Sequence, residues 1–200
     1  MKESIIITVL VIIIYIFFVS NKTNLLLIEN NGNSIYVRDM PDKDDSAIIL
    51  SELIDRMYSL RNYVVERRTN YIDFIEYIDL MNKNFSKTRT SIYENKIDSE
   101  LTSYSVNKGE EIVFCLRCKT TKRLHNINLL VYVAVHEMAH CACPEIGHPP
   151  LFNKIFKFLL EEAIKIKLYY YEDYSSNPVS YCGMNLYSNI LNWYKSICNP

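Results

Sequence analysis

The pentapeptide HEMAH, from His136 to His140, constrains this chain more than any other stretch. It lies within an apolar, helix-forming run, VYVAVHEMAHCAC. Residues four apart stack on one face of a helix, so both imidazoles can bind one cation while Glu137 lies beside it to move protons. The pattern is typical of zinc hydrolases, most often peptidases. It fixes three positions, so the alternative is a chance match on a buried helix.

The residues that follow bear on the third protein ligand that such a zinc site requires. Pro144 and Gly147 are expected to end the helix, because proline lacks a backbone donor and glycine tolerates a reversed backbone. His148 comes directly after that turn, where the chain can fold back toward the metal. We therefore predict His148 as the third ligand, and a surface-turn histidine is the plainer alternative.

Other side chains compete for the third position. One class of enzymes with this motif takes a glutamate from the next helix, where Glu161 and Glu162 lie, although solvent-facing charges explain both equally simply. Glu145 could also bind, but it lies in a tight turn. The metzincin pattern needs a histidine six residues after the second one, and Ile146 occupies that place.

The segment HEMAHCACPEIGHPPLFNKIFKFLLEEA resembles the active-site segment of the WLM and SprT-type metallopeptidases. Those proteins carry H-E-x-x-H, a short turn, a third His and then a Phe one helical turn on, here His148 and Phe152. The stretches LTSYSVNKGEEIVFCLRCK and INLLVYVAVHEMAH also resemble WLM-like proteins of large DNA viruses, so the resemblance covers roughly residues 86–184. It implies an α+β, minimal zincin-like fold with the active-site helix packed on a small sheet, and zinc-dependent proteolysis. Some relatives cleave proteins crosslinked to DNA.

A mechanism follows from these ligands. Three neutral imidazoles would leave Zn²⁺ its full charge, so that its water loses a proton near neutral pH. Glu137 is expected to accept that proton as general base and to deliver it to the leaving amine. Tyr174 and Tyr181 are candidate donors to the oxyanion, although most of the sixteen tyrosines must be structural. Asp173 could orient a ligand imidazole, or it could be an exposed loop residue.

Residues 4–19, SIIITVLVIIIYIFFV, carry no charge. As a helix they would span about 24 Å, slightly less than the ~30 Å apolar core of a bilayer, and Lys2 and Lys22 can extend the span by snorkelling. A cleaved signal peptide would need small residues before the cut, and the Phe17-Phe18-Val19 stretch supplies none. We predict a transmembrane anchor over residues 1–20 and a single-pass protein of a viral or host internal membrane. The flanking charges leave its orientation open.

The charge balance bears on partners. The net charge is −1 and the pI is about 6.4, so no overall attraction to nucleic acid is expected. A polypeptide is the expected substrate.

We predict four further regions after the anchor. They are a linker or short hairpin over residues 21–45, an N-terminal helical hairpin over 46–86, the metallopeptidase core over 87–184 and a C-terminal tail over 185–200. Within the core, residues 87–108 are expected to be irregular. Residues 112–117 are expected to form a strand, either at the sheet edge, where it could bind an extended substrate by strand addition, or as an ordinary sheet member.

Six cysteines allow more than one interpretation. C-L-R-C at residues 115–118 and C-A-C at residues 141–143 could form a second zinc site, but their spacings on a strand and a helix fit poorly. Buried free thiols are the better interpretation. Cys182 and Cys198 could pair if the domain faces an oxidising compartment.

The sequence thus predicts a membrane-anchored zinc metallopeptidase. The alternative from a different class is a membrane or virion structural protein that keeps the scaffold without turnover, and the presence of Glu137 favours the enzyme. A nucleic-acid-linked protease is a third hypothesis.

Overall fold

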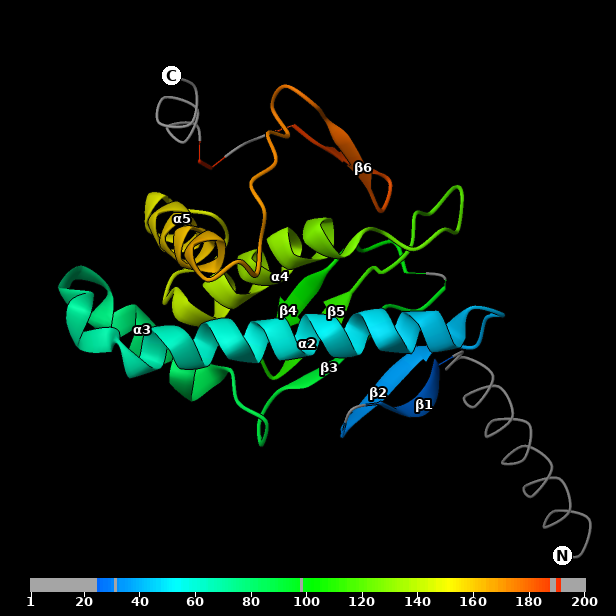
Figure 1. The fold of residues 1–200 in the computed structure, drawn as a ribbon, viewed down its shortest axis with the longest axis horizontal. Coiled ribbons are helices and arrows are strands. Elements are labelled where there is room, and N and C mark those ends of the chain that lie inside the picture. Colours follow the sequence, from blue (N-terminus) through cyan, green and yellow to red (C-terminus); the bar gives the residue numbers. More distant parts are fainter. Residues whose placement is uncertain (1–24, 31, 98, 188–189, 192–200) are drawn as a thin grey trace, which may run out of the picture.

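The structure, a computed structural model, describes residues 25–30, 32–97, 99–187 and 190–191. A five-stranded sheet and a layer of helices make up most of this part of the chain, and a small two-stranded hairpin lies near its C-terminal end (Figure 1). The anchor predicted over residues 1–20 lies outside the described residues. Among the helices described, none combines the length and the apolar character that a bilayer crossing requires.

The sheet is mixed, with the strand order β1-β2-β3-β5-β4. Its two outer pairs, β1 with β2 and β4 with β5, are antiparallel, whereas β2 with β3 and β3 with β5 are parallel. The strands of the sheet are β1 (Leu25–Asn30), β2 (Asn33–Arg38), β3 (Ser91–Glu94), β4 (Tyr104–Val106) and β5 (Glu111–Phe114). The separate hairpin consists of β6 (Val179–Tyr181) and β7 (Met184–Leu186).

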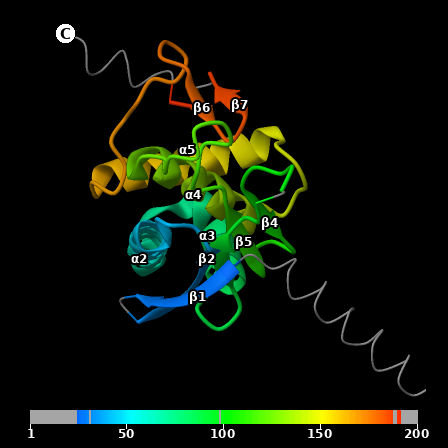
Figure 2. The same ribbon diagram turned by 90° about the vertical axis from the view of Figure 1, so that its right-hand side faces the viewer.

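The helices lie together on one side of the sheet (Figure 2). In chain order they are α2 (Lys43–Glu66), the short 3-10 helices η1 (Arg68–Asn70) and η2 (Ile72–Phe74), α3 (Ile75–Asn84), α4 (Ile127–Ala142) and α5 (Pro150–Lys165). Helix α4 contacts α2, α3 and α5 as well as β4, and α2 covers β1, β2 and β3. The α+β class, the helix carrying the HEMAH motif and the helix after it are therefore confirmed.

Helix α4 is buried because its sequence is apolar on nearly every side. Thirteen of its sixteen residues are buried, as expected of a helix that is apolar on most sides. Asn126 caps its start, since its side-chain oxygen accepts hydrogen bonds from the backbone N–H groups of Asn128 at 2.7 Å and Leu129 at 3.3 Å. The helix ends at Ala142, before Pro144 as predicted.

The N-terminal boundary of the core differs from the prediction. The expected short hairpin within residues 21–45 is present as β1 and β2, but it is not a linker, because β2 pairs with β3 and extends the main sheet. Ile35 and Val37 alternate into the core and are fully buried, which fixes one face of β2 against α2. The sheet therefore draws on residues far outside the predicted core of 87–184.

One expectation about the strands is wrong, and one open alternative is decided. The region of residues 87–108, expected to be irregular, contains β3 and β4. The strand expected over residues 112–117 is β5, which ends at Phe114 and lies between β3 and β4, so it is the ordinary sheet member and not the edge strand. Its continuous apolar run Ile112-Val113-Phe114 is buried, as is usual for an interior strand. The edge on this side of the sheet is β4.

A buried ionic network joins the sheet to α2. Arg117 donates from Nε to Glu94 Oε1 at 3.0 Å, and neither side chain is exposed to solvent. The other guanidinium nitrogens of Arg117 donate to the Asp42 carboxylate and the Ser46 hydroxyl. The second oxygen of Glu94 accepts from the backbone N–H of Arg38 at 2.8 Å. The network therefore holds the end of β5, strand β3 and the start of α2 together.

We expect Glu94→Ala to lower the free energy of unfolding by about 3–5 kcal/mol, because it removes the fully buried carboxylate that pairs with the buried Arg117 charge. Asp79→Ala, which removes the exposed partner of Arg68, is the control and should cost less than about 1 kcal/mol. Urea denaturation followed by circular dichroism measures both. Equal, small losses would contradict the structural role of the network.

Candidate metal centre

Helix α4 presents His136 and His140 on one face, one turn apart, with ring centroids separated by 4.9 Å. The spacing of four residues produces this arrangement, as the motif predicted. Glu137 follows His136 and is only 3% exposed. Two imidazoles and one carboxylate are thus carried by a single rigid helix.

The turn after α4 returns the chain toward these two rings. Gly147 has a positive φ of 78°, a conformation that favours glycine, and His148 follows it. Lys108, in the turn between β4 and β5, donates from Nζ to the carbonyl oxygens of Cys143, at 2.8 Å, and Glu145. The loop that carries His148 is therefore held from the opposite side of the site.

The three imidazoles converge on one point. His148 Nε2 lies 3.0 Å from His136 Nε2, and one nitrogen from each of His136, His140 and His148 lies within 4.8 Å of the others. Zinc–nitrogen bonds of about 2.0–2.1 Å at tetrahedral angles put ligand nitrogens roughly 3.3 Å apart. The three side chains therefore fit a cation held by three nitrogens. Across the described ranges, no second group of three such ligands converges in this way.

Phe152 supports the triad from beneath. Its buried ring lies 4.9 Å from the His136 ring, 4.4 Å from the His140 ring and 4.7 Å from the His148 ring, measured between centroids. Phe152 lies in the first turn of α5, so this helix fixes the orientation of all three imidazoles. The phenylalanine noted after the motif thus has a direct structural role.

Burial determines the protonation of these groups. It lowers the pKa of His136 to about 3 and that of His140 to about 4, with smaller contributions from the neighbouring histidines. Both imidazoles are therefore neutral near pH 7, the form that binds metal. Burial raises the pKa of Glu137 to about 8, and a hydrogen bond from the Ser105 side chain acts in the opposite direction. Glu137 Oε2 is buried and has no hydrogen-bond partner.

A cavity of about 730 Å³ opens beside the triad and is lined by all three histidines and Glu137. A buried carboxylate oxygen without a partner normally signals a missing water or ligand, and here it adjoins a space that can admit one. The remaining walls come from β4 and its flanks, from the turn of α4 that precedes the HEMAH motif, from the loop before His148 and from the β6–β7 hairpin. These lining residues are Thr102, Ser103, Tyr104, Ser105, Asn107, Lys108, Tyr132, Val133, Ile146, Gly147, Tyr181, Met184 and Leu186.

A disulfide holds the β6–β7 hairpin over the cavity. Cys182, in the hairpin turn, is bonded to Cys115, which follows β5 and lies 67 residues earlier in the chain. Cys115, expected to be a free thiol, is therefore disulfide-bonded, and its bond to Cys182 rules out the pairing of Cys182 with Cys198 that the sequence allowed. Cys198 itself lies outside the described residues. Cys141 and Cys143 are buried free thiols, as expected. No spacing in the sequence reveals which distant cysteines become neighbours.

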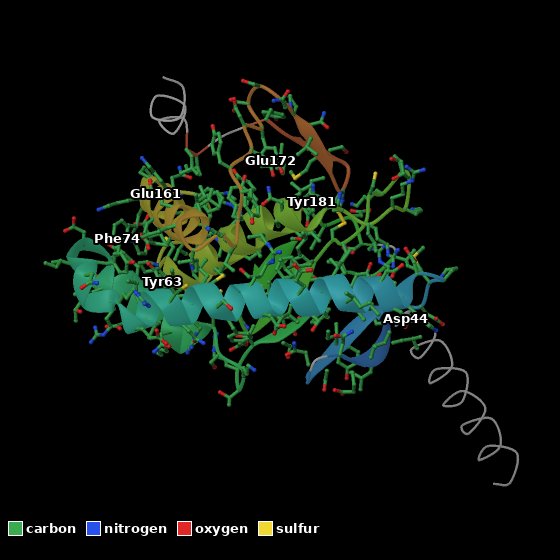
Figure 3. All side chains as sticks on the ribbon, viewed as in Figure 1. Asp44, Tyr63, Phe74, Glu161, Glu172 and Tyr181 are labelled. Atoms are coloured by element: carbon green, nitrogen blue, oxygen red, sulfur yellow. A yellow bond between two sulfur atoms is a disulfide. The ribbon has the colours of Figure 1, made fainter. Side chains whose placement is uncertain are left out.

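The two tyrosines predicted as oxyanion donors lie in different places. Tyr181 lines the cavity, is 2% exposed, and shares a hydrogen bond of 2.5 Å between its hydroxyl and that of Ser103. It is the last residue of β6, and Figure 3 shows it beside α4. Tyr174 packs on Tyr132 with ring centroids 5.1 Å apart and is not among the cavity-lining residues. Asp173 accepts hydrogen bonds from Ser175 in a local turn.

The rival third ligands do not join the triad. Glu162 accepts hydrogen bonds from the Tyr71 hydroxyl at 2.7 Å and from Lys165 at 3.3 Å. Its carboxylate therefore links α5 to the residue that precedes η2. Glu161 lies on α5, well separated from Tyr181 (Figure 3). Glu145 is exposed in the turn and is absent from the cluster of converging ligands. The structure thus places His148, and not these carboxylates, beside His136 and His140.

Several lining residues have no counterpart among the predicted site residues. Tyr132 and Val133 could have been found, because they precede His136 and Glu137 by one helical turn and share their face. Ser105 lies in β4 and Ser103 directly before it, and a strand of three residues is too short to give a clear strand signal in the sequence. Met184 and Leu186 reach the cavity through the disulfide-held hairpin, which local sequence patterns do not reveal.

Comparison with known proteins identifies relatives in viruses. No protein-family model matches the chain. It is 37% identical over 184 residues to "Uncharacterized protein R325" of Acanthamoeba polyphaga mimivirus, which covers 90% of this chain and 92% of that protein. The chain belongs to the family of this mimivirus protein.

Parts of the chain are also similar to proteins of iridescent viruses. The chain is 35% identical over 83 residues to protein 136R of Invertebrate iridescent virus 6 and 36% identical over 95 residues to protein 042R of Invertebrate iridescent virus 3. These matches cover 40% and 47% of this chain, and 46% and 58% of the iridescent virus proteins. The predicted resemblance to viral proteins is thus confirmed by the match to the mimivirus protein.

Among solved structures, the chain is similar to Wss1 from Saccharomyces cerevisiae. The TM-score is 0.46 at 21% sequence identity, over 66% of this chain and 88% of that one.

We expect the chain to bind one Zn²⁺, and His148→Ala to weaken that binding by at least roughly 100-fold, since loss of even a supporting partner costs 10–100-fold at such sites. Competition with a chromogenic chelator measures the affinity. Glu145→Ala, in the same turn, is the matched control and should leave it unchanged. If Glu145→Ala weakens binding and His148→Ala does not, the ligand set is wrong.

We expect Cys182→Ser to lower the free energy of unfolding by about 2–4 kcal/mol, because the bond to Cys115 closes a long loop. Urea denaturation under non-reducing conditions measures the loss, and Cys118→Ser, which removes a free cysteine, is the control. A reducing agent should lower the stability of the unmodified chain and leave Cys182→Ser unchanged. Indifference of the unmodified chain to reduction would show that the bond contributes nothing.

Proposed function

We propose that this chain is a zinc-dependent metallopeptidase that hydrolyses peptide bonds in a polypeptide substrate. The observation that carries the proposal is the convergence of three imidazoles beside a buried, unpaired carboxylate at an open cavity. The resemblance of residues 136–163 to the active-site segment of WLM and SprT-type metallopeptidases supports it.

In this proposal His136, His140 and His148 hold the zinc ion. When bound, zinc polarises the scissile carbonyl and lowers the pKa of water at the site. Glu137 acts as general base, taking a proton on Oε2, the oxygen without a partner, and delivering it to the leaving amine. Burial raises the pKa of Glu137 to about 8, so the group is mainly protonated near pH 7 without zinc, and the positive charge of a bound zinc ion would favour the carboxylate that accepts the proton.

Strand β4 is suited to hold an extended substrate. One of its edges pairs with β5, the other borders no strand of the sheet, and residues 102–105 line the cavity. Backbone groups on such an edge can pair with a peptide by strand addition. The role first expected for β5 therefore passes to β4, beside Glu137.

Tyr181 is our candidate for the donor that stabilises the oxyanion. Its hydroxyl lies in the cavity wall, and its hydrogen bond with Ser103 orients it. Ser103 is itself fixed by the backbone N–H of Cys115 at 3.1 Å. A preorganised donor of this kind favours the developing charge over the ground state.

The setting of the reaction is part of the same proposal. A membrane anchor over residues 1–20 would tether the catalytic domain to a viral or host internal membrane. The net charge of −1 gives no reason to invoke nucleic acid as a partner.

We expect the zinc-loaded full chain, kept in detergent, to cleave a denatured protein, and Glu137→Gln to lower the rate by at least ~100-fold while zinc binding persists. Appearance of new peptide termini by mass spectrometry measures cleavage. Glu145→Gln is the matched control and should retain the rate.

Two results separate the proposal from its alternatives. A chain that binds zinc but shows no Glu137-dependent cleavage would favour a structural role. Cleavage that requires added single-stranded DNA would favour the nucleic-acid-linked protease instead.

A further inference from the structure

One end of the cavity is built from apolar side chains. Tyr132 and Val133 line it from the same face of α4 as the metal ligands. Met184 and Leu186 line it from β7, where residues two apart point to the same side of the strand. Helix α4 and strand β7 therefore supply four uncharged, mainly apolar side chains beside the proposed catalytic centre.

The charged groups of the cavity belong to its other end. Glu137 adjoins the triad, and Lys108 is engaged by the carbonyl oxygens of Cys143 and Glu145 in the loop before His148. Apart from these two residues and the histidines, none of the described residues that line the cavity carries a charge. A charged substrate side chain at the apolar end would lose its hydration and find no counter-charge.

The distance from the metal ligands fixes which substrate residue meets these walls. Tyr132 and Val133 precede His136 and Glu137 by one helical turn, which is about 5.4 Å along the axis. An extended peptide advances about 3.3 Å per residue. The apolar end is therefore one or two residues away from the bond that is cleaved.

We propose that the β6–β7 hairpin and the start of α4 form a side-chain pocket that selects substrates with a large apolar residue, such as Leu or Phe, one or two positions from the scissile bond. This inference rests on the proposed peptidase function and adds the substrate class. The pocket is preformed, because the Cys115–Cys182 bond and the hydrogen bond between Tyr181 and Ser103 hold the hairpin in place. A preformed pocket loses little conformational freedom on binding.

The test uses peptides that are identical except at one position, which is Leu, Phe, Asp or Lys. Their binding to the zinc-loaded Glu137→Gln full chain in detergent is measured by fluorescence anisotropy, and their cleavage by the unmodified chain by mass spectrometry. We expect the Leu and Phe peptides to bind roughly 10- to 100-fold more tightly than the Asp and Lys peptides, as burial of one large apolar side chain allows.

Met184→Asp, introduced into the Glu137→Gln chain, tests the walls directly. Met184 is 48% exposed, so the substitution leaves the core intact, and it should reduce the preference for Leu over Lys by about tenfold or more. Asn185→Asp is the matched control, because it adds the same charge to the neighbouring, exposed residue that does not line the cavity. It should leave the preference unchanged.

The outcomes separate this inference from the proposed function. Cleavage or binding without any side-chain preference, or equal effects of Met184→Asp and Asn185→Asp, overturns the pocket and leaves the peptidase proposal standing. Selective binding of the Leu and Phe peptides without Glu137-dependent cleavage overturns the peptidase and supports apolar peptide recognition by the same pocket.

Discussion

The burial of α4 is the constraint on which the rest of the structure depends. Three helices and the edge strand β4 surround it, and most of its side chains fill the core between them. Its polar side chains are therefore restricted to the capped first turn and to the face that opens onto the cavity. Because that face is desolvated, its imidazoles are neutral and its carboxylate is a strong proton acceptor.

Close packing at this helix also fixes the elements around the site. A side chain at Gly109 would lie 2.7 Å from the Cys141 sulfur, so the turn after β4 fits against α4 only without one. On the other side, Phe152 presses α5 against all three imidazole rings. The ligands are thus oriented by apolar contacts with α5, an arrangement that favours precise coordination.

The cavity is assembled from segments that are far apart in the chain. Strand β4, helix α4, the turn with His148 and the β6–β7 hairpin each contribute one wall. The last of these would have little to hold it without the covalent link to Cys115, since a hairpin of two three-residue strands is marginally stable by itself. The substrate-facing side of the site therefore depends on long-range connections, whereas the metal-facing side is local.

This difference between local and long-range contacts explains which parts of the site the sequence predicts and which parts only the tertiary structure defines. The sequence alone determined the metal-facing half, because His136, Glu137 and His140 are set by helical periodicity and His148 by the turn that Pro144 and Gly147 impose. Tertiary structure decided the remainder: that residues 25–38 join the sheet, that β4 and not β5 is its edge, that Cys115 bonds to Cys182, and that Tyr181 rather than Tyr174 reaches the cavity. Strand pairing and disulfide choice depend on contacts between residues distant in the chain, and such contacts leave no regular spacing in the sequence to read.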